Sequence, residues 1–284
     1  MNYNSSNLIA RLADSLLAYN LSEYQLIIVN NSPEDRDVYR LKNPQVKIIE
    51  AQNNLGFGKA CNLGLSWIYQ QDQQAVVWLI NPDAYFALDV AANQKSPLDL
   101  AIAFFQNHPQ ISILGTVVRD AQGEITAAGG TFTPGKGSLS VITALPETID
   151  QDYWQTDWVS GCSLMINLTN FAELPYFNPR YFLYYEDLDF CLRYGQQGHQ
   201  IAVTNLITVN HDTSSITDRN LKQKFQHITR SYLIHMEKHS NLSIFIVTNI
   251  RMILNTFRLI FIKPQQGRGK LIGILNYWQE RLKV

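Results

Sequence analysis

The feature that most constrains the fold of this chain is an alternation of short apolar runs with helical patterns near its start. The runs at 26–29, 46–49 and 75–80 predict buried strands, and the spacing of leucines over 7–19 predicts an amphipathic helix. A glycine-punctuated segment at 53–64 leads into another predicted helix. Strands that alternate with helices indicate an α/β fold with a mostly parallel sheet flanked by helices, whose ligands bind beyond the carboxyl ends of the strands.

Length and composition fit one large α/β domain, or such a domain with an appendage. The chain has 284 residues and a net charge of −1, so it carries no overall basic field and we expect no nucleic-acid partner. Its cysteines, Cys61, Cys162 and Cys191, lie far apart without a CxxC pair, which fits a reducing compartment. The polar opening Met1-Asn2-Tyr3-Asn4 is unlike a signal peptide, so we expect a cytoplasmic location.

The charge is distributed unevenly along the chain. Residues 242–284 contain seven Lys or Arg and one acid, a net charge of +6, whereas the remainder carries −7. Short strands and Gly-rich turns between about 110 and 170 predict β-hairpins. We expect this segment to begin the part of the domain that binds an acceptor substrate. We therefore expect a catalytic domain over 1–215, followed by a helical, basic and amphipathic region over 216–284.

Two strand ends carry candidate metal ligands. Asn81-Pro82-Asp83 follows an apolar strand, and Asp83 either caps the next helix or binds a magnesium or manganese ion that neutralises a diphosphate. His211 follows the apolar run 201–209, and a histidine in this position is either a structural hydrogen-bonding group or a second ligand beside Asp83.

Three acids gather in Tyr184-Tyr185-Glu186-Asp187-Leu188-Asp189-Phe190. They either complement the dipole at a helix N-terminus or include a general base, since crowded carboxylates raise one another's pKa. The aromatic residues Tyr181, Phe182, Tyr184 and Tyr185 offer a stacking wall for a sugar. We favour the functional interpretation of this cluster.

The segment from Asn54 to Gly64 has the features of an anion site. Its glycines allow close approach of the backbone, and a helix N-terminus with Lys59 nearby favours a negative charge. The spacing matches neither a Rossmann GxGxxG fingerprint nor a P-loop, which argues against a dehydrogenase.

In order and spacing, these segments resemble the family 2 glycosyltransferases, especially the rhamnosyltransferase-like branch that builds bacterial surface polysaccharides. The resemblance covers about residues 2–240. The matching segments are Val29-Asn30-Asn31-Ser32, Asn54-Leu55-Gly56-Phe57-Gly58, Leu79-Ile80-Asn81-Pro82-Asp83, Trp158-Val159-Ser160-Gly161-Cys162, Tyr184-Tyr185-Glu186-Asp187-Leu188-Asp189 and His211.

The resemblance implies a GT-A fold, an inverting mechanism and a divalent cation, Mg or Mn. It places the metal at Asp83 and His211, makes Asp187 the base that deprotonates the acceptor hydroxyl, and gives Glu186 and Asp189 an orienting role. The implied donor-binding residues are Asn30, Asn31, Asn54, Gly56, Lys59, Asn62 and Asn81.

The implied donor is a dTDP-, UDP- or GDP-linked rhamnose or other hexose, and the acceptor is a glycan or a lipid-linked glycan. Two departures from the family concern the start of the chain. Asn30 stands where the family usually has an aspartate, and the family's first strand normally precedes Tyr3-Asn4, so we expect the native chain to begin upstream of Met1. The alternative function is a non-catalytic nucleotide-sugar-binding or scaffold protein with the same fold.

The basic tail contains an apolar segment at 242–262. Its length could span a bilayer, but Arg251 and Arg258 near its middle oppose insertion. Together with Thr248 and Asn255 they form a polar stripe on a helix that is otherwise apolar. This pattern predicts a helix in the interface of the inner membrane face, and the alternative is packing on the catalytic domain or on a second copy of the chain.

Overall fold

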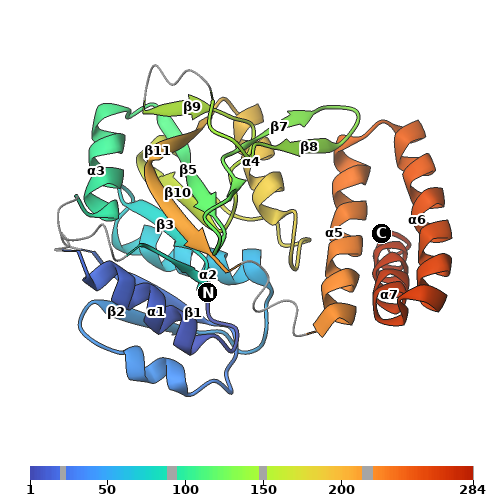
Figure 1. The fold of residues 1–284 in the computed structure, drawn as a ribbon, viewed down its shortest axis with the longest axis horizontal. Coiled ribbons are helices and arrows are strands. Elements are labelled where there is room, and N and C mark those ends of the chain that lie inside the picture. Colours follow the sequence, from blue (N-terminus) through green and yellow to red (C-terminus); the bar gives the residue numbers. More distant parts are fainter. Residues whose placement is uncertain (20–23, 88–94, 147–151, 213–219, 284) are drawn as a thin grey trace.

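The structure is a computed structural model that describes residues 1–19, 24–87, 95–146, 152–212 and 220–283. Figure 1 shows an α/β body on the left and three long helices on the right. The predicted boundary between residues 215 and 216 lies outside the described residues, so the division into two regions there stays a prediction.

The N-terminal part forms a small parallel sheet with helices beside it. It comprises α1 (Ser6–Leu17), β1 (Leu26–Asn30), the 3₁₀ helix η1 (Asp37–Leu41), β2 (Val46–Glu50) and α2 (Phe57–Gln71). β1 pairs with β2 in parallel, from Leu26 opposite Val46 to Asn30 opposite Glu50. These elements confirm the first two predicted strands and the two predicted helices.

The main sheet has the strand order β3-β10-β5-β11-β4, and two short strands, β6 and β9, pair with β5 and β11. Its members are β3 (Val76–Ile80), β4 (Ala84–Tyr85), β5 (Ile111–Arg119), β6 (Ile125–Ala127), β9 (Tyr153–Gln155), β10 (Ser163–Asn167) and β11 (Gln200–His211). β5 and β11 are parallel, whereas β10 is antiparallel to both β3 and β5, and β4 is antiparallel to β11. The α/β fold class is thus confirmed, but the sheet is mixed where a mostly parallel one was expected.

The reason for the mixed sheet lies in β10, which runs between two strands that precede it in the chain. Leu164 and Met165 are neighbours on β10 and point to opposite faces of the sheet. Both are fully buried, so both faces of the sheet are covered. A strand buried on both faces shows no alternation of apolar and polar residues, and its direction is not encoded in such a run.

The remaining elements of the body flank this sheet. α3 (Pro97–Asn107), the 3₁₀ helix η3 (Leu168–Asn170) and α4 (Glu186–Gln196) join the strands, and β7 (Gly130–Thr133) forms a hairpin with β8 (Ser138–Val141). The hairpin agrees with the Gly-rich turns of the sequence.

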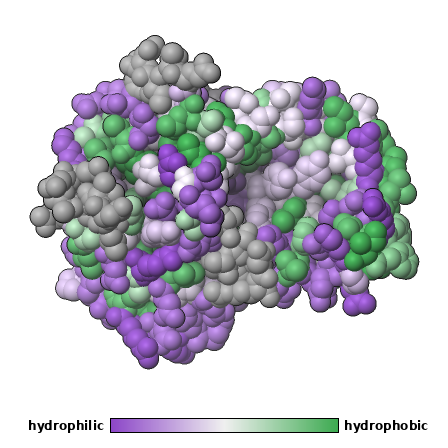
Figure 2. Space-filling view, viewed as in Figure 1, coloured by the Kyte–Doolittle hydropathy of each residue, from purple (hydrophilic) through white to green (hydrophobic). Residues whose placement is uncertain are grey.

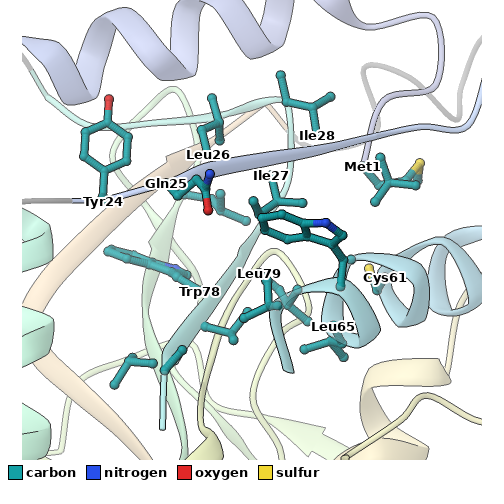
Figure 3. A pocket seen from close by; sticks show the side chains of 18 of the residues that line it. Met1, Tyr24, Gln25, Leu26, Ile27, Ile28, Cys61, Leu65, Trp78 and Leu79 are labelled. Carbon is teal, nitrogen blue, oxygen red and sulfur yellow. The ribbon is translucent and has the colours of Figure 1, made fainter. Parts of the chain in front are cut away.

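A cavity of ≈ 510 Å³ separates the small sheet from the main sheet. In Figure 3, Met1, Ile27 of β1, Cys61 of α2 and Leu79 of β3 border it. β1 and β3 belong to different sheets and do not pair with each other. The expected strand before Tyr3 stays a prediction.

The C-terminal helices α5 (Leu221–His239), α6 (Leu242–Ile262) and α7 (Pro264–Arg281) pack together beside the body (Figure 1). α7 lies close against α5 at Gly269. A Cβ at this position would lie only 2.3 Å from the carbonyl oxygen of Lys222, so glycine allows the close approach. Ion pairs join the helices to the body, with Arg180 3.5 Å from Glu237 and Lys238 2.7 Å from Asp189. The region therefore packs on the body as well as on itself.

Candidate active site

A second cavity, of ≈ 530 Å³, lies where the ends of β1, β3 and β11 meet the start of α4 and the first turn of α5. Such a volume suits a ligand of the size of a nucleotide sugar. Eight of the twelve predicted site residues line it, namely Asn31, Asn54, Gly56, Asn81, Asp83, Glu186, Asp187 and His211.

The two predicted metal ligands meet through strand pairing. His211 is the last residue of β11 and stands opposite Ala84 of β4, which follows Asp83. His211 Nε2 lies 3.1 Å from Asp83 Oδ1, and the backbone N–H of Asp212 donates to the carbonyl oxygen of Asp83 at 3.1 Å. Both side chains are largely buried. Residues 128 positions apart are thus fixed side by side by the backbone.

Asn31 organises another wall of the cavity at the end of β1. Its Nδ2 donates to Asn54 Oδ1 at 2.9 Å, and its Oδ1 accepts from the backbone N–H of Leu55 at 2.8 Å. Gly56 follows with φ of 80°, and a Cβ there would lie 2.1 Å from the carbonyl oxygen of Phe182. Glycine is required at this position because no side chain fits between the two backbone segments.

The acidic cluster is presented by an unusual backbone turn. Tyr184 and Tyr185 have φ of 69° and 67°, in the left-handed region that non-glycine residues avoid, and α4 begins immediately afterwards at Glu186. Strained residues of this kind concentrate at functional sites. The turn places Glu186 and Asp187 on the cavity wall.

Asp187 is held by backbone donors on both oxygens. The N–H of Gly161 donates to Oδ2 at 2.9 Å, and the N–H of Leu188 donates to Oδ1 at 2.8 Å. Burial raises the pKa of Asp187 above its ordinary value, although these two hydrogen bonds lower it in part. A carboxylate oriented in this way keeps a lone pair on each oxygen for a ligand hydroxyl.

Glu186 is the second acid of the cluster that lines the cavity. Burial, and then the charge of Asp187, raise the pKa of Glu186 to about 8. Its Oε2 is buried and has no hydrogen-bond partner in the described part of the chain. Glu186 is therefore mostly protonated at pH 7, and a buried carboxyl whose pKa is raised toward neutrality is typical of acid–base sites.

Four predicted site residues do not line the cavity. Asn30 is buried and donates from Nδ2 to Glu50, Lys59 is exposed on α2, and Asn62 binds the backbone of Phe177 through both ends of its amide. Asp189 is fully buried between Arg193 and Lys238, each at 2.7 Å. These four side chains support the walls of the cavity or lie outside it.

The expected aromatic wall is present in part. Phe182, Tyr184 and Tyr185 line the cavity. Tyr181 instead packs in a separate apolar cluster with Leu233 of α5 and Tyr277 of α7. Tyr181 therefore anchors the C-terminal helices, and its assignment to the wall was wrong.

The sequence profile described as Glycosyl transferase family 2 matches residues 1–119, a stretch that contains Asp83. The chain is 22% identical over 220 residues to the N-acetylglucosaminyl-diphospho-decaprenol L-rhamnosyltransferase of Mycobacterium tuberculosis, a match that covers 69% of each protein. It is 21% identical over 192 residues to the low-salt glycan biosynthesis hexosyltransferase Agl10 of Haloferax volcanii, covering 66% of this chain and 59% of that protein. The chain is thus a glycosyltransferase whose first 119 residues match family 2.

Two solved structures of other proteins share the fold of this chain. GalNAc-T7 with UDP, GalNAc and Mn²⁺ superimposes with a TM-score of 0.53 at 17% identity, over 72% of this chain and 41% of that one. S. aureus TarS, residues 1–349, superimposes with a TM-score of 0.52 at 16% identity, over 84% of this chain and 64% of that one. The chain thus spans less than two thirds of each of these two structures.

The geometry of Asp83 and His211 fits a divalent cation. Mg²⁺ binds ligands at about 2.1 Å in an octahedron, so two neighbouring ligand atoms lie about 3 Å apart. The separation of 3.1 Å between His211 Nε2 and Asp83 Oδ1 agrees with this. Within the described ranges no group of three or more His, Cys, Asp or Glu could hold a metal, so the other ligands would be donor phosphate oxygens and water.

The start of α5 supplies cavity residues that sequence reasoning missed. Asn220, Gln223, Lys224 and His227 line the cavity, and His227 stacks on Phe182 with ring centroids 4.5 Å apart. They were missed because the helix was assigned to a C-terminal appendage. Gly161 was also missed as a functional position, although the segment around it carried part of the resemblance to the family.

Proposed function

We propose that this glycosyltransferase moves a sugar, rhamnose or another hexose, from a nucleotide-diphosphate donor to a glycan or lipid-linked acceptor, with inversion at the anomeric carbon. This transfer is a step of surface polysaccharide synthesis and takes place in the cytoplasm, at the inner face of the membrane. The observation that carries the proposal is the convergence of Asp83, His211 and Asp187 on one cavity. The similarity to a rhamnosyltransferase of Mycobacterium tuberculosis supports the choice of sugar.

Asp187 acts as the general base. It accepts the proton of the acceptor hydroxyl while that oxygen forms a bond to the anomeric carbon and the bond from this carbon to the leaving phosphate oxygen breaks. The N–H groups of Gly161 and Leu188 orient its carboxylate for this transfer. A well-placed base contributes ~10²–10⁴-fold to the rate.

Asp83 and His211 hold the divalent cation, Mg²⁺ or Mn²⁺, which when bound neutralises charge on the leaving diphosphate. The distance of 3.1 Å between Asp83 Oδ1 and His211 Nε2 keeps these two atoms side by side, where both would face the cation. Asn81, whose Nδ2 lies 3.5 Å from His211 Nε2, adds a polar group to the same wall.

Asn31, Asn54 and Gly56 bind the donor. Asn31 and Asn54 fix the loop against the end of β1, so the loop's polar groups are in place before the donor arrives. Ordering a binding loop in advance reduces the entropy cost of binding. The dTDP, UDP and GDP carriers share the diphosphate, and the nucleotide base distinguishes them.

Donor turnover tests the proposal. Purified protein with Mn²⁺ and a panel of dTDP-, UDP- and GDP-sugars should release nucleoside diphosphate slowly from at least one donor. Asp187→Asn should lower that release by ~10²-fold or more, because the amide cannot accept the proton. Asp14→Asn, at an exposed position of α1, is the matched control and should leave the rate unchanged.

A donor that binds but is never turned over, with any acceptor tried, would instead support the alternative of a non-catalytic binding or scaffold protein. No feature of the described residues favours that alternative, because binding a donor requires no base, and a carboxylate is held ready by two backbone N–H groups.

A further inference from the structure

α6 has two faces with different surroundings. On its inner face Asn249 and Thr256 are buried, and each satisfies its side chain within the helix by donating to the carbonyl oxygens of Phe245 and Met252. Phe245 and Met252 pack against the apolar cluster that joins α5 and α7 to Tyr181. This face is therefore covered by the protein itself.

The outer face of α6 is apolar and uncovered. Ile246, Ile250, Leu254, Phe257 and Phe261 are 50%, 54%, 65%, 56% and 85% exposed. They recur every three or four residues, so they form one continuous stripe along the helix. Figure 2 shows hydrophobic surface along the outer edge of the molecule, where α6 lies in Figure 1. Exposed apolar patches of this extent mark sites that bind a protein or a membrane.

Two arginines follow one flank of this stripe. Arg251 and Arg258 are exposed, and their spacing of seven residues puts them on nearly the same side of the helix. Among the described residues neither makes an ion pair with an acid. The one acid of the tail, Glu280, is engaged by Arg180 and Arg230. Both guanidinium groups are thus available to an external anion.

We propose that the outer face of α6 docks on an anionic lipid membrane, with the apolar stripe in the acyl boundary and Arg251 and Arg258 at the level of the phosphates. The helix is long and apolar enough to span a bilayer, at 21 residues and a mean hydropathy of 1.5. Spanning would immerse both arginines at about 2.5 to 3.5 kcal/mol each and would detach the inner face from α7. A helix that lies in the interface avoids both costs.

Charge decides between a lipid surface and a second copy of the chain. Residues 242–284 carry a net charge of +6, so pairing two α6 faces would bring two basic surfaces together. Anionic headgroups complement the same charge, at about 1 kcal/mol per basic residue near the surface. The docking deepens the proposed function, since it would bring the enzyme to a lipid-linked acceptor, but the lipid contact itself requires no sugar transfer.

Flotation of the full-length protein with vesicles tests this docking. The protein should float with vesicles of phosphatidylglycerol and phosphatidylcholine, and much less with phosphatidylcholine alone. Ile250→Glu with Phe257→Glu should abolish flotation, and Arg251→Gln with Arg258→Gln should lower the partition coefficient roughly fivefold per arginine. Leu206→Glu, at a leucine of β11 that is 39% exposed, is the matched control and should float like the parent.

Any of three results would overturn the docking, and the first two come from flotation. Either the parent stays in solution with anionic vesicles, or the α6 double glutamate variant floats as well as the parent. Sedimentation without lipid detects a dimer, and a dimer lost on Ile250→Glu with Phe257→Glu would assign the face to self-association. Release of nucleoside diphosphate in free solution should be unchanged in all α6 variants, so a failure of membrane docking is distinguished from a failure of the proposed transfer.

Discussion

The backbone N–H of Gly161 donates to Oδ2 of Asp187 at 2.9 Å, across 26 positions of sequence. The contact joins the loop before β10 to the first turn of α4, and a side chain at position 161 would crowd Asp187. A Cβ at position 161 would lie 3.2 Å from the Cβ of Asp187 and 3.4 Å from its Oδ2. The position of the proposed base therefore depends on a glycine.

Gly161→Ala should lower kcat by roughly tenfold to a hundredfold with little change in donor KM, because a shift of the carboxylate by a fraction of an ångström misdirects proton transfer. Steady-state kinetics of donor turnover measure this. Gly195→Ala in α4, where the new Cβ would meet only Ile201 at 3.4 Å, should leave kcat unchanged. An equal loss in both variants would contradict the role of Gly161.

Glu186→Gln should make folding stability less dependent on pH. Below pH 4.5 the carboxyl is protonated in both folded and unfolded chains; as the pH rises toward 8 only the unfolded chain ionises, so stability is lost progressively up to the folded pKa of about 8. The glutamine variant should be more stable than the parent at pH 8, by roughly 2–4 kcal/mol, and similar at pH 4.5.

Thermal unfolding at both pH values checks this prediction. Glu173→Gln, at an exposed position, supplies the control, since an exposed glutamate has nearly the same surroundings in folded and unfolded chains. If the difference in stability between the parent and Glu186→Gln is the same at pH 4.5 and at pH 8, Glu186 does not titrate as its burial implies.

Asp83→Asn and His211→Ala should each weaken metal activation. Each removes one of two protein ligands, so the Mn²⁺ concentration for half-maximal donor turnover should rise at least ~10-fold. Titration of Mn²⁺ at saturating donor measures it. His108→Ala is the control, because this histidine packs at a tilt against Tyr153 and does not line the cavity. A Mn²⁺ requirement that is unchanged in both site variants would show that Asp83 and His211 do not bind the cation.

Lys224→Ala should raise donor KM roughly tenfold with kcat little changed. Lys224 lines the cavity from α5, and loss of one charge-assisted contact to a diphosphate corresponds to about 1.4 kcal/mol. Lys222→Ala, two residues earlier on the same helix and exposed, should keep the parent KM. Matching KM values for the two variants would place the diphosphate elsewhere in the cavity.

The sequence predicted that polar groups at strand ends face a ligand site. The ends of β3 and β11 belong to the main sheet, whereas the end of β1 reaches the cavity from the small sheet. Through the resemblance the sequence also singled out Asp83, Asp187 and His211, and all three line the cavity. It did not predict the direction of β10. A strand that is buried on both faces is a continuous apolar run, and such a run does not indicate whether the strand pairs in parallel or antiparallel.

The contribution of α5 to the cavity could not be predicted either. The three C-terminal helices show only a helical period and a basic charge in the sequence. Their placement against the body depends on Tyr181 packing with Leu233 and on ion pairs such as that between Arg180 and Glu237, which join positions far apart in the chain. Long-range contacts of this kind leave no local pattern.

Asp189 illustrates how a residue in a functional motif can serve the fold. It is fully buried and lies 2.7 Å from both Arg193 and Lys238, so it ties α4 to α5 while its neighbours face the cavity. Asp189→Asn should lower the free energy of unfolding by about 2–4 kcal/mol, since it removes the common acceptor of two cations.

At a temperature where Asp189→Asn remains folded, the KM for donor should stay within about twofold of the parent, because the side chain does not reach the ligand. Chemical denaturation and donor kinetics on the same preparation separate the two effects. Lys238→Met should destabilise less, since Arg193 still neutralises Asp189. Full stability of Asp189→Asn together with lost turnover would instead assign this carboxylate to the chemistry.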